Sequence, residues 1–204
     1  MIPVSPAKEN ILKKIRQALS NPVPLPFAAS EGNSSLYQAP HDDLEVVFAE
    51  TFTQLQGKFA FCMDAAQLQQ QLQELVAQKG WKNIYCRDAA FSAWGNTTDL
   101  AACDASITGC EYLVARTGSI VLSAAQEGGR TVSVYAPVHI CIAYTHQLVF
   151  DIKDALQSLK EKYGDNIPSL FTFATGPSRT ADIEKTLVTG VHGPKEVYLF
   201  LVEG

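Results

Sequence analysis

The chain has 204 residues, which suits one domain with a short appendage and is long enough to bury a substantial core. Its 16 basic and 21 acidic residues give a formal net charge of −5, so nothing indicates a basic surface for nucleic acid. The N-terminus lacks the apolar core of a signal peptide, and no apolar run approaches the roughly 18 residues that cross a bilayer, so we expect a cytoplasmic protein without a membrane partner.

An amphipathic helix followed by an extended arm is predicted at the N-terminus. Ser5-Pro6 is typical of a helix start, and the following apolar residues have helical spacing. These are Ile11, Leu12, Ile15 and Leu19. The proline-rich run 21–26 ends the helix, and the composition up to Pro40 is that of a linker. We therefore divide the chain into a helix and proline-rich arm, residues 1–41, which packs on the domain or reaches a partner, and an α/β domain, residues 42–204.

The remaining pattern alternates strands with helices. Helices are predicted over 42–55, 65–78 and 151–163, the second of them stopped by Gly80. Strands are predicted over 59–62, 83–86, 112–115, 119–123, 131–135, 139–144, 170–174 and 196–202, with a hairpin through residues 126–129. This alternation predicts a mainly parallel sheet covered on both faces, a Rossmann-like sandwich in which ligands bind at the carboxyl ends of the strands.

Residues 172–194 combine two glycine turns, two hydroxyls, an arginine, a carboxylate and a histidine. Gly176-Pro177-Ser178 breaks an apolar strand before a helix-like run, residues 180–188. A strand-loop-helix corner is a natural anion site, with Ser178, Arg179 and Thr180 as donors. The alternative is that Ser178 or Thr180 caps the helix, that Asp182 favours its positive end, and that residues 190–194 are a plain turn. Arg179 favours the anion site, because capping does not require a guanidinium.

A second polar group precedes this segment. Thr117-Gly118-Ser119 lies between two apolar strands, where it is either a simple bend or a close approach to a ligand. His139 begins a strand and His192 lies between two glycines, positions from which a side chain reaches a cleft and donates to a carboxylate or phosphate. The predicted ligand-binding residues, which we expect to share one cleft, are Thr117, Gly118, Ser119, Arg130, His139, Gly176, Ser178, Arg179, Thr180, Asp182, His192 and Gly193.

Other common sites are not indicated. The five cysteines form no Cys-x-x-Cys pair and the four histidines are far apart, so neither an iron–sulfur cluster nor a metal site is expected in this chain. Dinucleotide, P-loop, zincin and hydrolase-elbow motifs are missing. A triad of Ser178, Asp182 and either His139 or His192 is conceivable, but only geometry defines a triad.

Four ordered motifs resemble the lactate utilisation (LUD) domain, and specifically the lactate utilisation protein C family. They are Thr-Gly-Ser at 117–119, Pro-Val-His-Ile at 137–140, Gly-Pro-Ser-Arg-Thr-Ala-Asp-Ile at 176–183 and Val-His-Gly-Pro at 191–194, within a resemblance covering residues 59–202. The resemblance implies a three-layer α/β fold like that of sugar-phosphate isomerases and coenzyme A transferases. Family members often carry an acidic residue where this chain has Arg116, so no catalytic role is carried over to that position.

The resemblance also implies a function. The chain is expected to be the non-cluster subunit of a cytoplasmic system that oxidises L-lactate to pyruvate, binding a small anionic ligand, with iron–sulfur clusters on its partner subunits and no cofactor of its own. Two other classes stay open: a stand-alone enzyme acting on a phosphorylated sugar, acyl-coenzyme A or pteridine, and a non-catalytic assembly protein. No catalytic residue is assigned.

Overall fold

The computed structural model describes residues 6–20, 43–181 and 187–204, in two units, Met1–Ala39 and Pro40–Gly204. In the first unit, α1 (Pro6–Leu19) confirms the predicted helix. Its apolar side chains Ile11, Leu12 and Ile15 are exposed. No helix in the described ranges combines the length and the apolar character that a membrane span needs.

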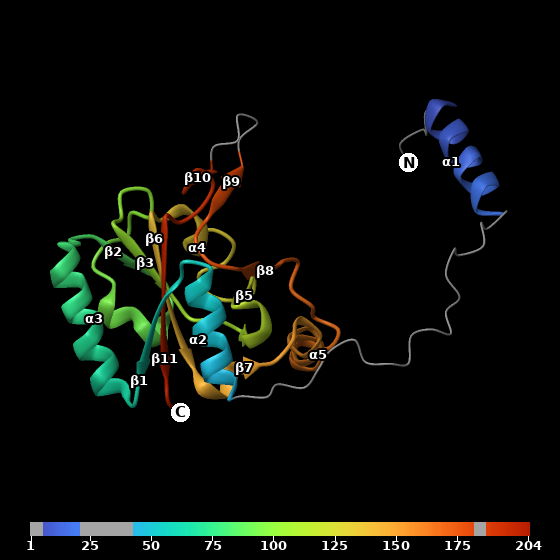
Figure 1. The fold of residues 1–204 in the computed structure, drawn as a ribbon. Coiled ribbons are helices and arrows are strands. Elements are labelled where there is room, and N and C mark those ends of the chain that lie inside the picture. Colours follow the sequence, from blue (N-terminus) through green and yellow to red (C-terminus); the bar gives the residue numbers. More distant parts are fainter. Residues whose placement is uncertain (1–5, 21–42, 182–186) are drawn as a thin grey trace. The chain divides into compact units, whose positions relative to one another are not determined.

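A sheet of five parallel strands forms the centre of the second unit (Figure 1). In spatial order the strands are β1 (Lys58–Cys62), β11 (Glu196–Val202), β6 (Val138–Tyr144), β3 (Ala105–Thr108) and β2 (Ile84–Cys86). Four of the five were predicted from apolar runs. β3 was missed because Ser106 and Thr108 make its short sequence half polar, although all four of its residues are buried.

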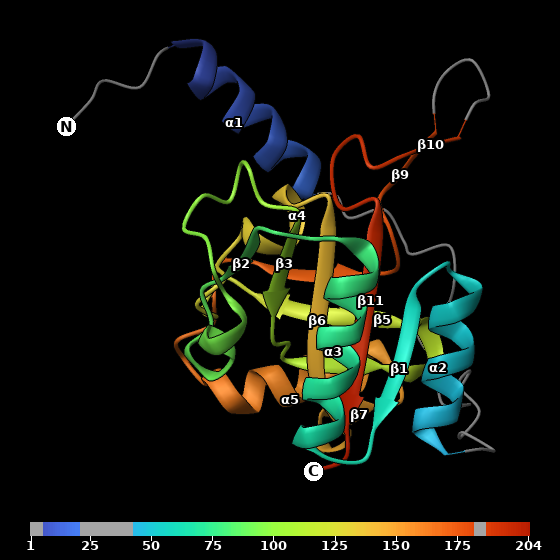
Figure 2. The ribbon, with the colours of Figure 1, turned by 90° about the vertical axis from the view of Figure 1, so that its left-hand side faces the viewer.

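One face of this sheet is covered by α3 (Ala65–Lys79), which lies in front of the strands in Figure 2. The Asp64 carboxylate caps its first turn by accepting from the Gln67 amide at 2.7 Å, and Gly80 ends it in the left-handed conformation. Leu68 and Leu72 are buried against the sheet. The short η2 (Ala89–Trp94) adds Phe91 to the same core.

The other face is covered by α2 (Leu44–Gln54) and by a second sheet, whose strands run across behind the first in Figure 2. That sheet has the order β7 (Leu148–Val149), β4 (Tyr112–Val114), β5 (Ser119–Ser123) and β8 (Phe171–Ala174). Helix α5 (Ile152–Tyr163) packs on it through Ala155 and Leu159. The predicted α/β sandwich with a mainly parallel central sheet is thus confirmed, with a second sheet as part of one cover.

Two predicted elements and one predicted hairpin are wrong. Residues 131–135 form no strand, because after the turn at 126–129 the chain enters α4 (Val132–Tyr135), whose Val132 is buried. The predicted hairpin at that turn is absent for the same reason. The helix predicted over 180–188 is replaced by β9 (Arg179–Ala181) and β10 (Leu187–Thr189), which pair antiparallel. Apolar residues at helical spacing suggested a helix, but three cross-strand pairs take these backbone groups instead. Asp182 lies outside the described residues.

Candidate functional site

The two C-terminal motifs form one structure at the amino ends of β6 and β11. The Ser178 amide donates to the Pro194 carbonyl at 2.9 Å, and the Gly190 amide donates to the Ser178 carbonyl at 3.0 Å. A Cβ at Gly193 would lie only 2.9 Å from the Ser178 Cβ, so glycine allows this close approach. The structure therefore brings together Ser178, His192 and Gly193, three of the predicted ligand-binding residues.

The far end of this loop is also fixed. The Lys195 amide donates to the Pro137 carbonyl at 2.8 Å, which ties the loop to the start of β6. Gly190 has a φ of +77°, and a Cβ there would lie 2.2 Å from the Lys195 Cγ. The Lys195 stem thus lies directly over the glycine, in space that no other residue would leave open.

A hollow of about 490 Å³ lies between this loop and the end of α4. We call it the signature pocket, and its lining residues are Val134, Tyr135, Ala136, Pro137, Gly190, Val191, His192, Gly193 and Lys195. His192 and Lys195 are both exposed, and no carboxylate is found among the lining residues that the structure describes. Within the described part of the chain, the amides of Val191, His192 and Gly193 donate no hydrogen bond. Three successive unpaired amides beside a cation favour an anion.

The signature pocket lies at the amino ends of the parallel strands, whereas the sequence predicted a site at their carboxyl ends. At the carboxyl ends of β2 and β3, the turn at residues 126–129 covers the strands and leaves a gap of about 10 Å³. The turn is held there by the Glu127 carboxylate, which accepts from the Ala89 amide at 2.6 Å. A gap of that size holds at most one water, so at β2 and β3 the carboxyl ends, where such sheets usually bind ligands, are covered by the protein itself.

Another group of predicted residues meets at the carboxyl end of α2. Cβ atoms at Gly118 and Gly176 would lie 2.9 Å from the Phe52 nitrogen and 2.7 Å from the Leu55 oxygen, respectively. The Arg179 guanidinium donates to the same Leu55 carbonyl at 2.5 Å. Arginine is well suited to this position, because the last carbonyls of a helix lack partners within it. The structure thus brings Gly118, Gly176 and Arg179 together around a helix end.

The hydroxyls beside this group bond to one another. Ser119 is buried, and its Oγ lies 2.8 Å from the Thr117 Oγ1 and 2.8 Å from the Thr175 Oγ1. This chain of hydroxyls joins β5 to the residue that follows β8. It therefore stabilises the contact between the Thr-Gly-Ser motif at 117–119 and the residue directly before the motif at 176–183.

Arg130 and His139 do not line the signature pocket. Arg130 is exposed and its guanidinium donates to the Ser169 hydroxyl at 2.5 Å. His139 is fully buried, with its Nε2 2.8 Å from the Thr108 Oγ1, and burial lowers its pKa to about 4. It is therefore a neutral core residue at pH 7 and not a surface donor to a ligand. Thr180 is part of β9.

Arg116, the departure from the family pattern, has a structural partner. Its Nε and Nη2 donate to the Asp151 carboxylate at 2.7 and 3.0 Å. Asp151 is buried and is the N-cap of α5. The hydrogen bonds from Arg116 lower the pKa of Asp151, and burial opposes them only in part. A bidentate arginine thus fixes the start of α5.

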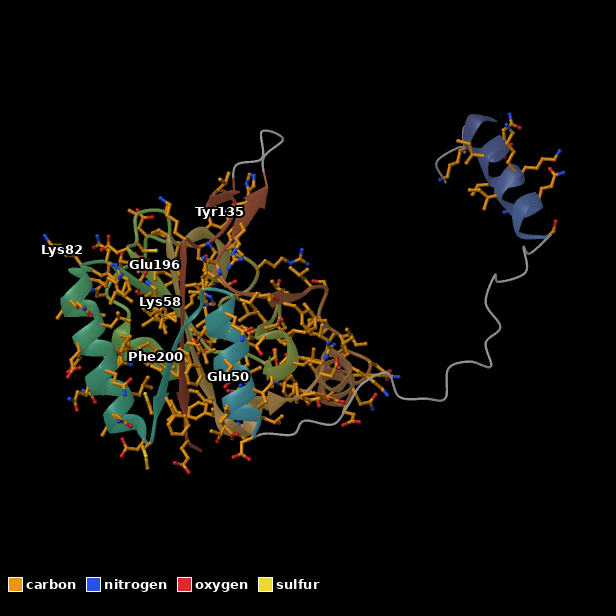
Figure 3. All side chains as sticks on the ribbon, in the orientation of Figure 1. Glu50, Lys58, Lys82, Tyr135, Glu196 and Phe200 are labelled. Carbon is orange, nitrogen blue, oxygen red and sulfur yellow. The ribbon has the colours of Figure 1, made fainter. Side chains whose placement is uncertain are left out.

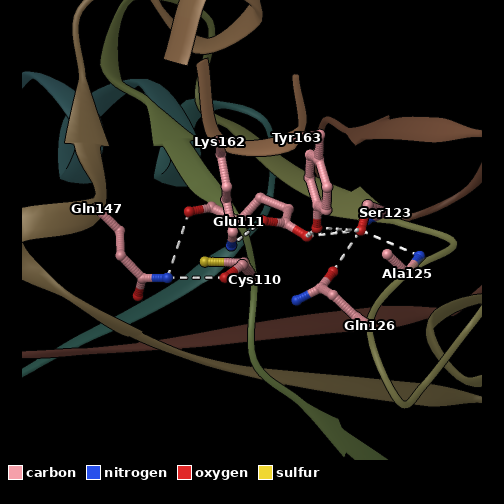
Figure 4. Close-up of polar contacts among 8 residues, drawn as sticks. All are labelled: Cys110, Glu111, Ser123, Ala125, Gln126, Gln147, Lys162 and Tyr163. Atoms are coloured by element: carbon pink, nitrogen blue, oxygen red, sulfur yellow. Dashed lines mark hydrogen bonds and ion pairs between the residues drawn. The ribbon is translucent and has the colours of Figure 1, made fainter. Parts of the chain in front are cut away.

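Sequence reasoning missed a buried carboxylate, Glu111 (Figure 4). It accepts from the Ser123 hydroxyl at 2.5 Å, the Tyr163 hydroxyl at 2.7 Å and the Lys162 ammonium at 2.7 Å. Burial raises the pKa of Glu111, but these three hydrogen bonds outweigh it and hold the pKa below its ordinary value. The network joins the start of β4 to the end of β5 and of α5.

We expect Glu111→Gln to lower the free energy of unfolding by about 2 kcal/mol, because an amide cannot accept all three donors and leaves at least one of them unsatisfied. Urea unfolding at pH 7 measures this. Glu161→Gln, on the exposed side of α5, is the matched control and should change stability by less than about 0.5 kcal/mol. Equal effects of the two substitutions would contradict a structural role for the network.

Comparison with known proteins agrees with this architecture. The model of the LUD domain matches residues 81–202. Lactate utilization protein C of Bacillus licheniformis is 38% identical over 99 residues, 48% of this chain and 41% of that protein. An uncharacterized protein of Neisseria meningitidis is 35% identical over 100 residues, 48% of this chain and 42% of that protein. These alignments thus span less than half the length of either relative.

Two further relatives extend over more of the chain. Lactate utilization protein C of Shouchella clausii is 27% identical over 190 residues, 82% of each chain. A crystal structure of a DUF162 family protein from Deinococcus radiodurans superposes with a TM-score of 0.58, at 18% identity, over 81% of this chain and 99% of that one. That likeness supports the fold, and the domain match covers more than half of the sequence. The chain therefore belongs to the LUD domain family.

Proposed function

We propose that this protein is the non-cluster subunit of a cytoplasmic system that oxidises L-lactate to pyruvate, and that it binds an anionic ligand in the signature pocket. The first part is supported by its family and by the relatives named lactate utilization protein C. In this proposal, iron–sulfur clusters on partner subunits carry the electrons. This chain binds or positions a ligand for them.

The proposed binding of an anion is supported by the composition of the pocket wall. Anions need several donors, and a nearby carboxylate would repel them. The pocket offers the amides of residues 191–193, the His192 ring and the Lys195 ammonium, and none of its described lining residues is acidic. Because the loop is tied to Ser178 at one end and to Pro137 at the other, little ordering is needed when a ligand binds.

The affinity of the isolated full chain for anions tests the pocket. We expect Lys195→Gln to weaken binding of lactate, pyruvate or inorganic phosphate, whichever binds wild type, by about tenfold, since a hydrogen bond from a charged group contributes about 1.5 kcal/mol or more. Calorimetric titration measures the loss. Lys160→Gln, at another exposed lysine, on α5, should leave the affinity unchanged. Unchanged affinity in Lys195→Gln would remove the pocket from the proposal.

The proposed place in lactate oxidation needs a separate test. A strain lacking this protein should lose growth on L-lactate and keep growth on pyruvate. Co-purification with subunits that contain stoichiometric iron and sulfide would identify the proposed partners. Normal growth of the strain on L-lactate would contradict the role.

A further inference from the structure

We infer that the signature pocket takes an organic anion with a planar ring, of the nucleoside monophosphate class, with the phosphate on the amides of residues 191–193 and the ring on Tyr135. This inference rests on the proposed anion site and adds the nature of the rest of the ligand. It depends on the size of the hollow, on its exposed apolar side chains and on the backbone hydrogen bond that joins their segment to the loop with the amides.

The hollow is much larger than a three-carbon acid requires. Its volume of about 490 Å³ corresponds to about 16 water molecules at roughly 30 Å³ each. Lactate and pyruvate have only six non-hydrogen atoms. Pockets of about 300 to 1,000 Å³ are typical of larger ligands that bury most of their surface. An anion held by residues 191–193 would therefore leave most of the hollow for another part of the same molecule.

Apolar side chains line the rest of the hollow. Tyr135 is 70% exposed and Val191 is 53% exposed, and the exposed Pro137 lies between α4 and β6. Tyr135 lies at the foot of the β9–β10 hairpin in Figure 3. Large exposed apolar side chains gathered around a hollow indicate a binding surface, and a tyrosine ring offers a flat face on which another ring stacks.

A backbone hydrogen bond joins the segment of the apolar part to the loop of the anion part. Tyr135 ends α4 and is followed closely by Pro137, whose carbonyl accepts from the Lys195 amide. The Lys195 stem is in turn placed by Gly190. One wall thus presents a ring and the other a cation with the three amides of residues 191–193. This combination matches a heteroaromatic ring joined to a phosphate, whereas a sugar phosphate has no aromatic ring to stack on Tyr135.

Calorimetric titration of the full chain with AMP, GMP, CMP, UMP, adenosine and inorganic phosphate tests the inference. We expect at least one nucleotide to bind about tenfold or more tightly than either adenosine or phosphate. Tyr135→Ala should weaken nucleotide binding at least about fivefold and leave phosphate binding unchanged, because only the stacking contact is lost. Lys195→Gln should weaken both. Met63→Ala, an equally exposed apolar residue after β1, should change neither.

The outcomes separate the two proposals. If no nucleotide binds more tightly than phosphate, or if Tyr135→Ala binds nucleotide as well as wild type does, the ring-bearing ligand is overturned and the anion site stands. If neither nucleotides nor the simple anions bind, both the ring-bearing ligand and the anion site are overturned. Growth on L-lactate reports on the proposed metabolic role independently of either result.

Discussion

Replacing Gly118 or Gly176 with alanine should lower the free energy of unfolding by about 3 kcal/mol or more. Both glycines have positive φ, +59° and +77°, a conformation that costs a residue with a Cβ about 1–2 kcal/mol. The alanine methyl groups would also lie 2.9 and 2.7 Å from backbone atoms of residues 52 and 55, respectively. Backbone at a helix end cannot move aside cheaply, so overpacking adds about 1–3 kcal/mol.

Gly129→Ala is the matched control for this prediction. Gly129 has a φ of +58°, but a Cβ there would meet nothing within 4 Å. Its replacement should therefore cost only the conformational part, about 1–2 kcal/mol. Urea unfolding of the three variants at pH 7 gives the comparison. If Gly118→Ala and Gly176→Ala cost no more than Gly129→Ala, the two motifs are not packed against α2 as the structure has them.

Elements with strong local signals were predictable from the sequence. Helix α3 has an aspartate before its first turn, apolar residues at helical spacing and a glycine directly after it, and its predicted bounds are correct to one residue. Strands β5, β6 and β11 are largely apolar, as expected of strands buried on both faces. In these segments local preference and tertiary burial favour the same structure.

Elements that depend on distant partners were not predictable in the same way. Residues 187–189 form a strand because they pair with residues 179–181, and a helical spacing of apolar residues does not reveal that pairing. Val132 and Val134 favour a strand by their side chains, yet α4 forms where Val132 is buried and its carbonyl accepts from the Ser106 hydroxyl at 2.8 Å. Tertiary contacts override weak local preferences in such short elements.

The candidate site was predictable in its loop but not in its walls. The glycines and the histidine of the last motif indicated a loop with a ligand, and His192 and Gly193 do line the signature pocket. Tyr135 and Lys195 belong to no recognisable motif. They line the same pocket because the Pro137 carbonyl, two residues after Tyr135, accepts from the Lys195 amide. His139 gave a misleading signal. It alternates with Ile140 and Ile142 along β6, and that alternation places its side chain on the face of the second sheet, not in a cleft.

Acidification should destabilise the protein through His139, by about 3 kcal/mol between pH 7 and pH 4. In the folded protein burial lowers the pKa of His139 to about 4, from 6.5 in the unfolded chain. Between these values the unfolded chain binds a proton that the folded protein does not, so the free energy of unfolding falls as the pH falls. The contribution is fully present above pH 6.5 and is lost by about pH 4. A difference of about 2.5 pKa units corresponds to about 3 kcal/mol.

His139→Gln isolates this effect, because glutamine can still bond to the Thr108 hydroxyl but does not titrate. Its free energy of unfolding should be nearly independent of pH between 6.5 and 4.5, where wild type loses stability steadily. Carboxylates add their own loss at lower pH. Glu196, for example, has its pKa lowered to about 2 by the Lys58 and Tyr198 hydrogen bonds, so its stabilisation is lost only from about pH 4.5 downward. Urea unfolding of both proteins at half-unit steps of pH separates the two windows. Parallel curves for wild type and His139→Gln above pH 4.5 would show that His139 is protonated as readily in the folded protein as in the unfolded chain, and that the Thr108 pair is open to water.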